Sequence, residues 1–188
     1  MIRKRIFDLF FGVLIIIALI VPMIFIFIFV KCTSKGPAIY SSFRVGKDNK
    51  IFKMPKFRSM IIEVPDVATH LLNNPDTFLT PIGSFLRRYS LDELPQLLSV
   101  LKGDMSFVGP RPALHNQYDL INLRTEKGVH KLLPGITGWA QINGRDELSI
   151  PEKVKLDEEY LNRFTFWFDI NILWMTLIKV TKSDGVRH

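Results

Sequence analysis

The sequence predicts an α+β protein that is predominantly helical, with a membrane-inserted N-terminal helix and a small domain on one side of the membrane. Residues 9–30 form an uncharged apolar segment that contains Pro22, and this segment predicts the membrane helix. Residues 39–54 alternate apolar and polar positions around a turn, which predicts a short β-hairpin. The 188 residues are enough for one domain with a core. We therefore expect a membrane anchor over residues 1–35 and a folded domain over residues 36–188.

The apolar segment is predicted to enter and leave the membrane on the same side. A straight helix over residues 9–30 could span roughly 30 Å of hydrocarbon, and an ordinary spanning helix is the alternative. Pro22 cannot donate a backbone hydrogen bond to the carbonyl of Ala18, so the helix should kink there. Basic residues flank the segment on both sides, and a spanning helix would place one basic cluster outside, against the positive-inside bias. These observations favour a re-entrant helix–break–helix with Pro22 as the break.

The next elements follow from the spacing of apolar, glycine and proline residues. The predicted hairpin turns at residues 46–50, and residues 61–79 are polar and broken by prolines, which is typical of a loop with a short helix. Apolar residues recur at helical spacing over residues 84–101, and Pro95 marks a boundary within this run.

The C-terminal half is predicted to contain two further helices. One is expected over residues 113–131, and a glycine-rich ordered loop follows over residues 134–144. Residues 164–180 are dense in apolar and aromatic side chains. Tryptophan is favourable at a headgroup boundary, so we interpret this segment as an amphipathic helix in or near the membrane interface. A plain core helix is the alternative.

Composition narrows the classes of partner. The formal net charge is +7, and such a field could attract nucleic acid, anionic lipid or a phosphorylated substrate. No nucleic-acid-binding signature accompanies the charge, so we expect lipid and phosphate partners and no nucleic acid. The single cysteine, Cys32, cannot form an intramolecular disulfide, and the four histidines lack metal-ligand spacing. A zinc site is therefore not expected.

Two adjacent carboxylates, Asp92 and Glu93, are the strongest candidates for chemistry. Ser90 and Glu93 also fit a capping box, in which Glu93 would only satisfy a backbone N–H. Neighbouring residues on a helix diverge by about 100°, so the two carboxylates suit different tasks. One can attack an electrophile while the other binds a cation. The backbone N–H groups at a helix start would also favour an incoming phosphate.

Arginines near these carboxylates could bind phosphate. Arg87 and Arg88 precede the acidic pair, and Arg111 lies between two prolines that fix its backbone and pre-orient its planar guanidinium. Arg145 follows a glycine in a similar but weaker arrangement. The chain has no Asp-x-Asp motif, Walker-type glycine loop or Gly-x-Ser-x-Gly motif, which argues against several common nucleotide-dependent and hydrolytic enzymes.

Four motifs, in this order, give the chain a resemblance to a known family. They are FKMPKFRSM at 52–60, SLDELPQ at 90–96, LKGDMSFVGPRP at 101–112 and PGITGWAQINGR at 134–145. The chain resembles the small monotopic phosphoglycosyl transferases of the bacterial sugar transferase family over essentially its whole length. The resemblance implies an enzyme of the bacterial inner (cytoplasmic) membrane, with residues 36–188 as the catalytic domain on the cytoplasmic face.

The resemblance further implies a reaction and its residues. A sugar-1-phosphate would pass from a UDP-sugar to undecaprenyl phosphate in two ping-pong steps. Asp92 would attack the β-phosphorus, expel UMP and carry a phosphosugar–aspartyl intermediate, which undecaprenyl phosphate then attacks. Mg²⁺ would neutralise the diphosphate, with Glu93 as its protein ligand. The residues expected to contact phosphate are Arg88, Arg111, Lys56 and Arg145.

Two positions depart from the commoner pattern of the family. Val21 stands where a small polar residue often precedes the breaking proline, so the bend rests more heavily on Pro22. Ser59 stands where threonine is common, a change that should be tolerated.

Two other functions compete with this interpretation. A non-catalytic membrane module could bind polyprenyl phosphate or anionic lipid through the basic face. A metal-dependent glycosyltransferase could move the sugar alone and release UDP instead of UMP. The C-terminal helix could also serve contacts in a homodimer.

Overall fold

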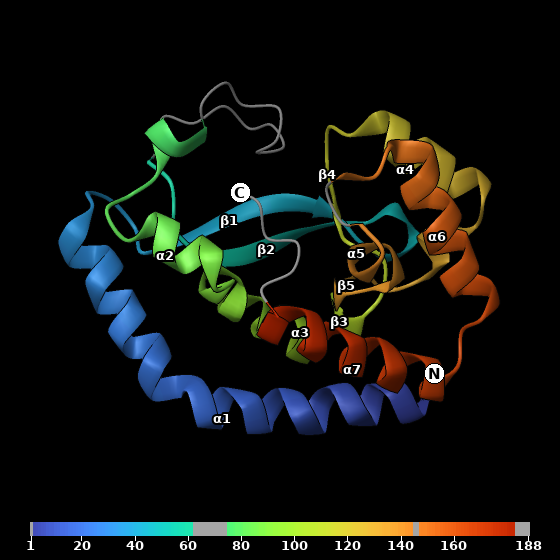
Figure 1. The fold of residues 1–188 in the computed structure, drawn as a ribbon, viewed down its shortest axis with the longest axis horizontal. Helices are drawn as coiled ribbons and strands as arrows, with labels where there is room; N and C mark the ends of the chain where they lie inside the picture. Colours follow the sequence, from blue (N-terminus) through green and yellow to red (C-terminus); the bar gives the residue numbers. More distant parts are fainter. Residues whose placement is uncertain (1, 62–74, 145–146, 183–188) are drawn as a thin grey trace.

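The computed structural model describes residues 2–61, 75–144 and 147–182. The chain combines many helices with two small sheets, and helix predominates, which confirms the predicted mixture of secondary structure (Figure 1). With η denoting a 3₁₀ helix, the elements in chain order are α1 (Ile2–Thr33), β1 (Ile39–Val45), η1 (Lys47–Asn49), β2 (Ile51–Phe57), η3 (Pro75–Phe78), α2 (Gly83–Arg88), η4 (Leu91–Gln96), α3 (Leu97–Lys102), β3 (Ser106–Val108), β4 (Ala113–Leu114), α4 (Tyr118–Glu126), η5 (Val129–Lys131), β5 (Gly135–Thr137), α5 (Trp139–Ile142), α6 (Ile150–Asn162) and α7 (Phe166–Lys182).

The predicted hairpin is present. Strands β1 and β2 pair antiparallel from Ile39 opposite Phe57 to Val45 opposite Ile51. Asp48 and Asn49 adopt left-handed conformations in the turn, which asparagine and aspartate tolerate better than most residues. Strand β4 extends this sheet on the other edge of β1, and β3 pairs with β5 as a separate parallel ribbon.

Helix α1 is one continuous helix that contains Pro22. It changes direction part-way along its length (Figure 1), as expected where a proline leaves a carbonyl without its helical donor. The structure therefore has one bent helix instead of two helices separated at the proline. Within the described residues it is the one helix long and apolar enough to cross a membrane.

The N-terminal end of α1 is fastened to the domain by charged side chains. The Arg5 guanidinium donates hydrogen bonds to the carbonyls of Val100 (2.6 Å) and Leu101 (2.7 Å), in the last turn of α3. A cation is favourable there because the last carbonyls of a helix have no helical donor. Lys4 Nζ lies 2.6 Å from Asp169 Oδ2, and the Tyr160 hydroxyl donates to Asp169 Oδ1 at 2.6 Å. We call Lys4, Tyr160 and Asp169 the anchor cluster.

The C-terminal end of α1 rests on the same domain. Val30 is fully buried in an apolar cluster with Phe57 from β2 and Leu86 from α2. Just beyond the helix, the Arg58 guanidinium donates to both the carbonyl (3.0 Å) and the hydroxyl (2.8 Å) of Ser34. Most of the side chains between the two ends are exposed. The apolar helix therefore lies along the domain with both ends attached to it.

The run over residues 84–101 is helical with a break near Pro95, as predicted, but it also breaks at Ser90, and the alternative capping box at Ser90 is absent. Ser90 adopts a left-handed conformation (φ 53°) and its side chain caps no helix. This turn separates α2 from η4, and Pro95 lies inside η4, where a proline disfavours regular helix in the residue before it. Three short elements, α2, η4 and α3, therefore cover this run, and α3 begins two residues after Pro95. The Glu93 side chain is left to bind other partners.

Other predicted elements are refined. The region 113–131 begins with β4 and continues as α4 and η5, and the region 134–144 contains β5 and α5 in addition to loop. Of the loop predicted over residues 61–79, residues 62–74 lie outside the described part, and the rest includes η3.

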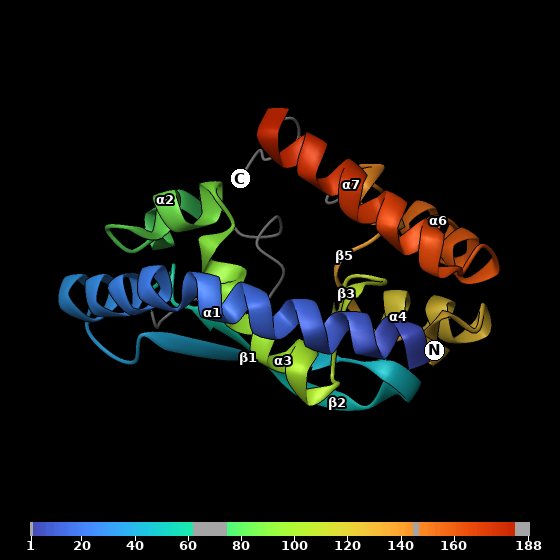
Figure 2. The same ribbon diagram turned by 90° about the horizontal axis from the view of Figure 1, so that it is seen from below.

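Helix α7 has one face in the core and one exposed face. Phe168 and Ile172 are buried, whereas Trp167 is 78% exposed and Trp174 is 63% exposed. Seen from below, α7 lies on the same side of the molecule as α1 (Figure 2). The helix packs one face on the core and presents aromatic residues outward, and its placement at a membrane interface stays a prediction.

Candidate active site

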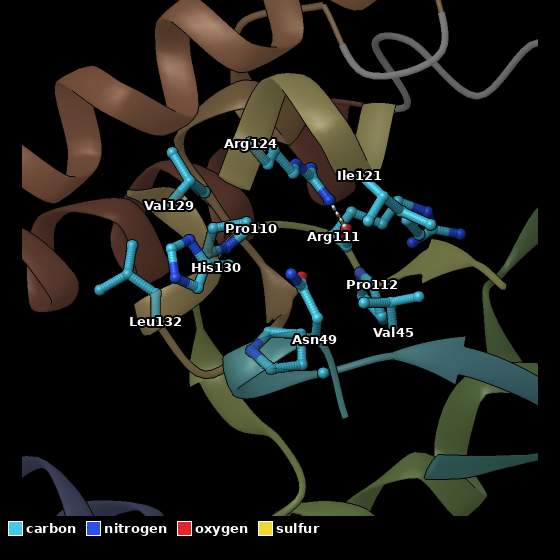
Figure 3. A pocket seen from close by; sticks show the side chains of 13 residues that line it. Val45, Asn49, Pro110, Arg111, Pro112, Ile121, Arg124, Val129, His130 and Leu132 are labelled. Atoms are coloured by element: carbon cyan, nitrogen blue, oxygen red, sulfur yellow. Dashed lines mark hydrogen bonds between the residues drawn. The ribbon is translucent and has the colours of Figure 1, made fainter. Parts of the chain in front are cut away.

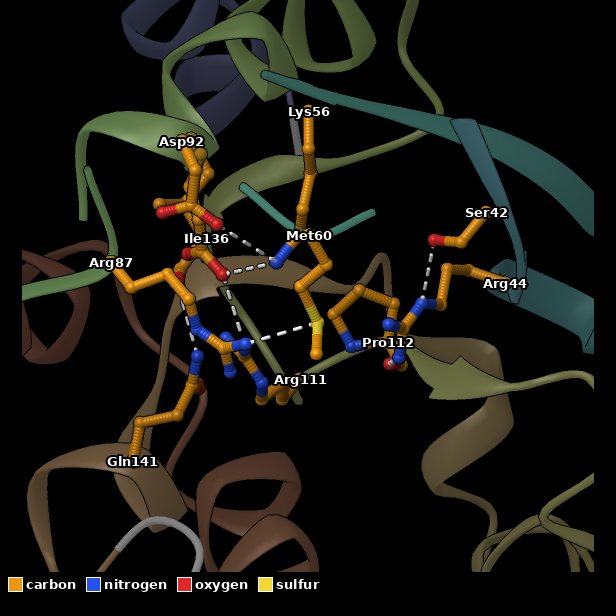
Figure 4. A network of polar contacts seen from close by, with 11 residues as sticks. Ser42, Arg44, Lys56, Met60, Arg87, Asp92, Arg111, Pro112, Ile136 and Gln141 are labelled. Atoms are coloured by element: carbon orange, nitrogen blue, oxygen red, sulfur yellow. Dashed lines mark hydrogen bonds and ion pairs between the residues drawn. The ribbon is translucent and has the colours of Figure 1, made fainter. Parts of the chain in front are cut away.

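The acidic pair begins helix η4, directly after the left-handed turn at Ser90. The side chains of Asp92 and Glu93 are only 11% and 12% exposed. Strand β2 packs against η4 and directs Lys56 toward both carboxylates (Figure 4). The turn and the strand together place two carboxylates in a largely water-excluded position. Burial of that kind requires compensating positive charge.

Two cations share one oxygen of Glu93. Lys56 Nζ lies 2.7 Å from Glu93 Oε1, and an Arg111 terminal nitrogen lies 3.0 Å from the same atom (Figure 4). Lys56 Nζ is also 4.0 Å from Asp92 Oδ2, which is an electrostatic contact longer than a hydrogen bond. We call Lys56, Asp92, Glu93 and Arg111 the site cluster. Its members come from three segments that are distant in sequence.

Burial raises the pKa of the Asp92 carboxyl above its ordinary value. Lys56 is the main opposing influence, Glu93 raises the pKa further, and Arg87 and Arg111 lower it. The surrounding cations therefore decide how readily this buried carboxyl becomes an anion. A carboxylate with little water around it and cations nearby is suited to attack an electrophile that those cations also bind.

The backbone of the Pro110–Pro112 segment is held through its carbonyls, because proline has no N–H to donate. The carbonyl of Pro110 accepts a hydrogen bond from Gly135 N (2.9 Å), and that of Arg111 accepts one from Arg124 (2.8 Å). The Pro112 carbonyl accepts a longer bond from Arg44 (3.3 Å). Three donors from β5, α4 and β1 thus fix three successive residues.

Two glycines allow β3 and β5 to approach closely enough for this arrangement. A Cβ atom at Gly109 would collide with the carbonyl of Leu133, and one at Gly135 would collide with the backbone N of Gly109. The two backbones are therefore in direct contact beside the proline–arginine–proline segment. Larger residues at either position would displace it.

The two arginines that precede the acidic pair point to different places. Arg88 is exposed, and its guanidinium lies 6.0 Å from the centre of the Tyr89 ring. Arg87 influences Asp92 electrostatically and contacts Met60 Sδ at 3.1 Å. Both arginines are similarly near in sequence to the acidic pair, but neighbouring positions of a helix such as α2 face different directions.

The remaining predicted contacts divide into those inside and outside the site cluster. Lys56 and Arg111 lie inside it, whereas Arg145 lies outside the residues that the structure describes. Sequence reasoning missed Arg124 and Arg44, which hold the backbone of Arg111 and Pro112. No local motif marks either residue, because each acts on a segment far away in sequence.

The described side chains do not form a complete metal site by themselves. Among the described residues, no group of three or more histidine, cysteine, aspartate or glutamate side chains could hold a metal. Mg²⁺ commonly uses one or two carboxylates, together with water and substrate phosphates. Asp92 and Glu93 supply oxygen donors of the right kind, but Glu93 already pairs with two cations. The residues therefore fit a cation that arrives with an anionic substrate.

Comparison with known proteins places this site in a family. The family model for bacterial sugar transferases matches residues 1–183. The chain belongs to the bacterial sugar transferase family. It is 43% identical over 191 residues to the uncharacterized sugar transferase EpsL of Bacillus subtilis (strain 168), covering 100% of this chain and 92% of EpsL.

Two longer relatives carry more specific names. The chain is 44% identical to the UDP-glucose:undecaprenyl-phosphate glucose-1-phosphate transferase of Escherichia coli (strain K12), with 94% of this chain matching 39% of that protein. It is 39% identical to the undecaprenyl-phosphate galactose phosphotransferase of Salmonella typhimurium, with 97% of this chain matching 41% of that protein. The chain thus spans about two fifths of each of these relatives.

Proposed function

We propose that this protein transfers a sugar-1-phosphate from a UDP-sugar to undecaprenyl phosphate and releases UMP. The observation that carries the proposal is the site cluster, in which a buried carboxylate lies beside two cations that already bind an anionic oxygen. A diphosphate is an anion that the same cations could bind. The names of the Escherichia coli and Salmonella relatives support undecaprenyl phosphate as the acceptor.

The first proposed step is attack by Asp92 on the β-phosphorus of the donor. A carboxylate oxygen forms a bond to this phosphorus, and the bond from phosphorus to the bridging oxygen breaks. UMP leaves with the electron pair, and the sugar phosphate stays on the aspartyl group. In the second step a phosphate oxygen of undecaprenyl phosphate attacks the same phosphorus and frees the Asp92 carboxylate. One site can then serve a soluble donor and a lipid acceptor in turn.

Lys56 and Arg111 would bind the donor by exchanging the Glu93 carboxylate for the diphosphate of the UDP-sugar. In the structure both pair with Glu93 Oε1. A bound diphosphate would compete with Glu93 for both side chains, and Glu93 would then be free to hold a magnesium ion. Mg²⁺, when bound, supplies further positive charge for the diphosphate. The planar fork of Arg111 can donate two parallel hydrogen bonds to phosphate oxygens in a fixed geometry, which a lysine ammonium does not provide.

We propose a monotopic arrangement in which α1 is re-entrant and the domain lies on the cytoplasmic face. Lys4 and Arg5 at one end of α1 contact the domain, as does Val30 at the other end. A spanning helix would place these ends on opposite sides of the membrane, where one domain could not hold both. The exposed tryptophans of α7 support contact with the headgroup region.

Identification of the released nucleotide tests the proposed function. Purified protein would be incubated with Mg²⁺, undecaprenyl phosphate and a panel of UDP-sugars that includes UDP-glucose and UDP-galactose. We expect UMP release that depends on the lipid acceptor at steady state and disappears in Asp92→Asn. Release of UDP would instead establish a glycosyltransferase. Lipid binding without release of either nucleotide would establish a non-catalytic binding module.

A further inference from the structure

We propose that Arg124 is a positioning residue that fixes the backbone of Arg111 and thereby aims the Arg111 guanidinium at the donor phosphates. This inference rests on the proposed function, because it assigns Arg124 a role in the same reaction. In the described contacts, the Arg124 side chain reaches the site cluster only at the backbone carbonyl of Arg111 and contacts none of the cluster's side chains. Its effect passes through one carbonyl group.

Three hydrogen bonds use the planar geometry of the Arg124 side chain. Its Nε and one terminal nitrogen donate to Asp157 Oδ2 at 2.9 and 2.7 Å. The other terminal nitrogen donates to the carbonyl oxygen of Arg111 at 2.8 Å, as Figure 3 shows. Two donors on one edge of the guanidinium therefore bind Asp157 of α6, and the remaining donor binds the proline–arginine–proline segment.

The Arg124–Asp157 pair is held away from water. The side chain of Asp157 is 2% exposed and that of Arg124 is 11% exposed. A buried ion pair with several hydrogen bonds has little freedom to move. Arg124 lines a small pocket of about 30 Å³ together with Arg111, Val129 and His130 (Figure 3). The Arg111 carbonyl is therefore attached to a rigid part of the domain.

The Arg111 side chain needs this support more than its neighbours in the site cluster do. Its side chain is 32% exposed, compared with 18% for Lys56 and 12% for Glu93. Packing alone therefore leaves it the most freedom. A long side chain on a displaced backbone would miss the phosphate oxygens, and misplacement by about 1 Å can cost about 100-fold in rate.

A second ion pair between the same parts of the fold offers a matched control. Lys127, directly after α4, lies 3.3 Å from Glu158 on α6. This pair is 52% and 33% exposed and touches no part of the proline–arginine–proline segment in the described contacts. Lys127→Ala therefore removes a link between α4 and α6 without removing the support of Arg111.

The test compares three variants by the kcat/KM for the UDP-sugar, measured per amount of folded protein. Arg124→Met leaves a buried aspartate unpaired and could fail to fold, so Arg124→Met/Asp157→Leu is included because it removes both charges. We expect both to lose about 10- to 100-fold in kcat/KM. Lys127→Ala should stay within about twofold of the wild type. A double variant with wild-type kcat/KM would overturn the proposal, because Arg124 would then serve only to neutralise Asp157.

If Arg124 positions Arg111, its effect on kcat/KM should require the Arg111 side chain. A general structural role for Arg124 would not have this requirement. In an Arg111→Ala background, adding Arg124→Met/Asp157→Leu should change kcat/KM by less than about twofold, since there is no guanidinium left to aim. A full further loss of 10- to 100-fold in that background would contradict the proposal. Failure of the wild-type protein to release UMP would instead refute the proposed function.

Discussion

The site cluster and the anchor cluster both pair cations with carboxylates, but they differ in how exposed the cations are and in how the hydrogen bonds are distributed. In the anchor cluster, Lys4 donates to Asp169, to the carbonyl of Val108 and more distantly to Tyr160, and Tyr160 donates to Asp169. In the site cluster, Lys56 and Arg111 both contact Glu93 Oε1. Lys56 Nζ also lies 4.0 Å from Asp92 Oδ2.

The difference shows how one kind of ion pair can serve two purposes. Lys4 and Asp169 are 14% and 6% exposed and form a closed network that joins α1 to α6 and α7. Arg111 remains a third exposed, so the site cluster has a cation within reach of a ligand. A closed network stabilises the fold, whereas an open one can exchange its anion for a substrate.

Replacing the carboxylate at the centre of the site cluster should have the largest effect on activity. Asp92→Asn removes the nucleophile, so we expect transfer to fall by about 10⁴-fold or more. Because burial makes the Asp92 carboxylate costly, the free energy of unfolding should stay unchanged or rise. UMP release assays and thermal unfolding in detergent measure the two quantities. A large loss of stability would show that Asp92 is structural.

Breaking the anchor cluster should give the opposite result. Lys4→Met leaves Asp169 buried without its cation and should cost about 3–5 kcal/mol in the free energy of unfolding. The folded fraction should keep its transfer rate within about twofold, because the two clusters share no residue. Denaturant unfolding in micelles provides the measurement. Stability equal to that of the wild type would mean that α1 is not held by this contact.

Changing the shape of the exposed cation should have an intermediate effect. Arg111→Lys keeps the positive charge but removes the planar fork, so we expect kcat/KM for the UDP-sugar to fall by about tenfold. Steady-state kinetics over a range of donor concentrations would show this. Unchanged kinetics would indicate that Arg111 acts only as a point charge.

The two arginines of α2 should give the smallest effects and differ from each other. Arg88→Ala removes an exposed side chain that lies over Tyr89, so activity should stay within about twofold. Arg87→Ala removes positive charge that acts on Asp92 and should lower kcat/KM by about fivefold. Parallel kinetic measurements on both variants check this. Loss of activity only in Arg88→Ala would support Arg88 as the phosphate contact, as the sequence predicted.

Local patterns predicted the parts of the fold that local forces determine. Strand alternation and the turn at Asp48 and Asn49 identify the hairpin, and the apolar run identifies α1. The motifs also pointed to the members of the site cluster, although their mutual distances needed the structure.

The conformation of Ser90 and the contacts of Arg124 could not be predicted from the sequence. The left-handed Ser90 is rare for a residue with a side chain, and it excludes the capping box that Ser90 and Glu93 could have formed. Arg124 pairs with Asp157 across two helices and holds Arg111 through its backbone. No periodicity encodes either contact, because each depends on how distant elements pack.

The most direct test of the central claim is the intact mass of the protein after incubation with Mg²⁺ and a UDP-sugar, without a lipid acceptor. The proposed mechanism predicts an added sugar phosphate on the wild-type protein, release of one UMP for each adduct, and no adduct on Asp92→Asn. Addition of undecaprenyl phosphate should remove the adduct. An Asp92→Asn protein that still forms the adduct, or that still transfers sugar phosphate to the lipid at the wild-type rate, would contradict Asp92 as the nucleophile.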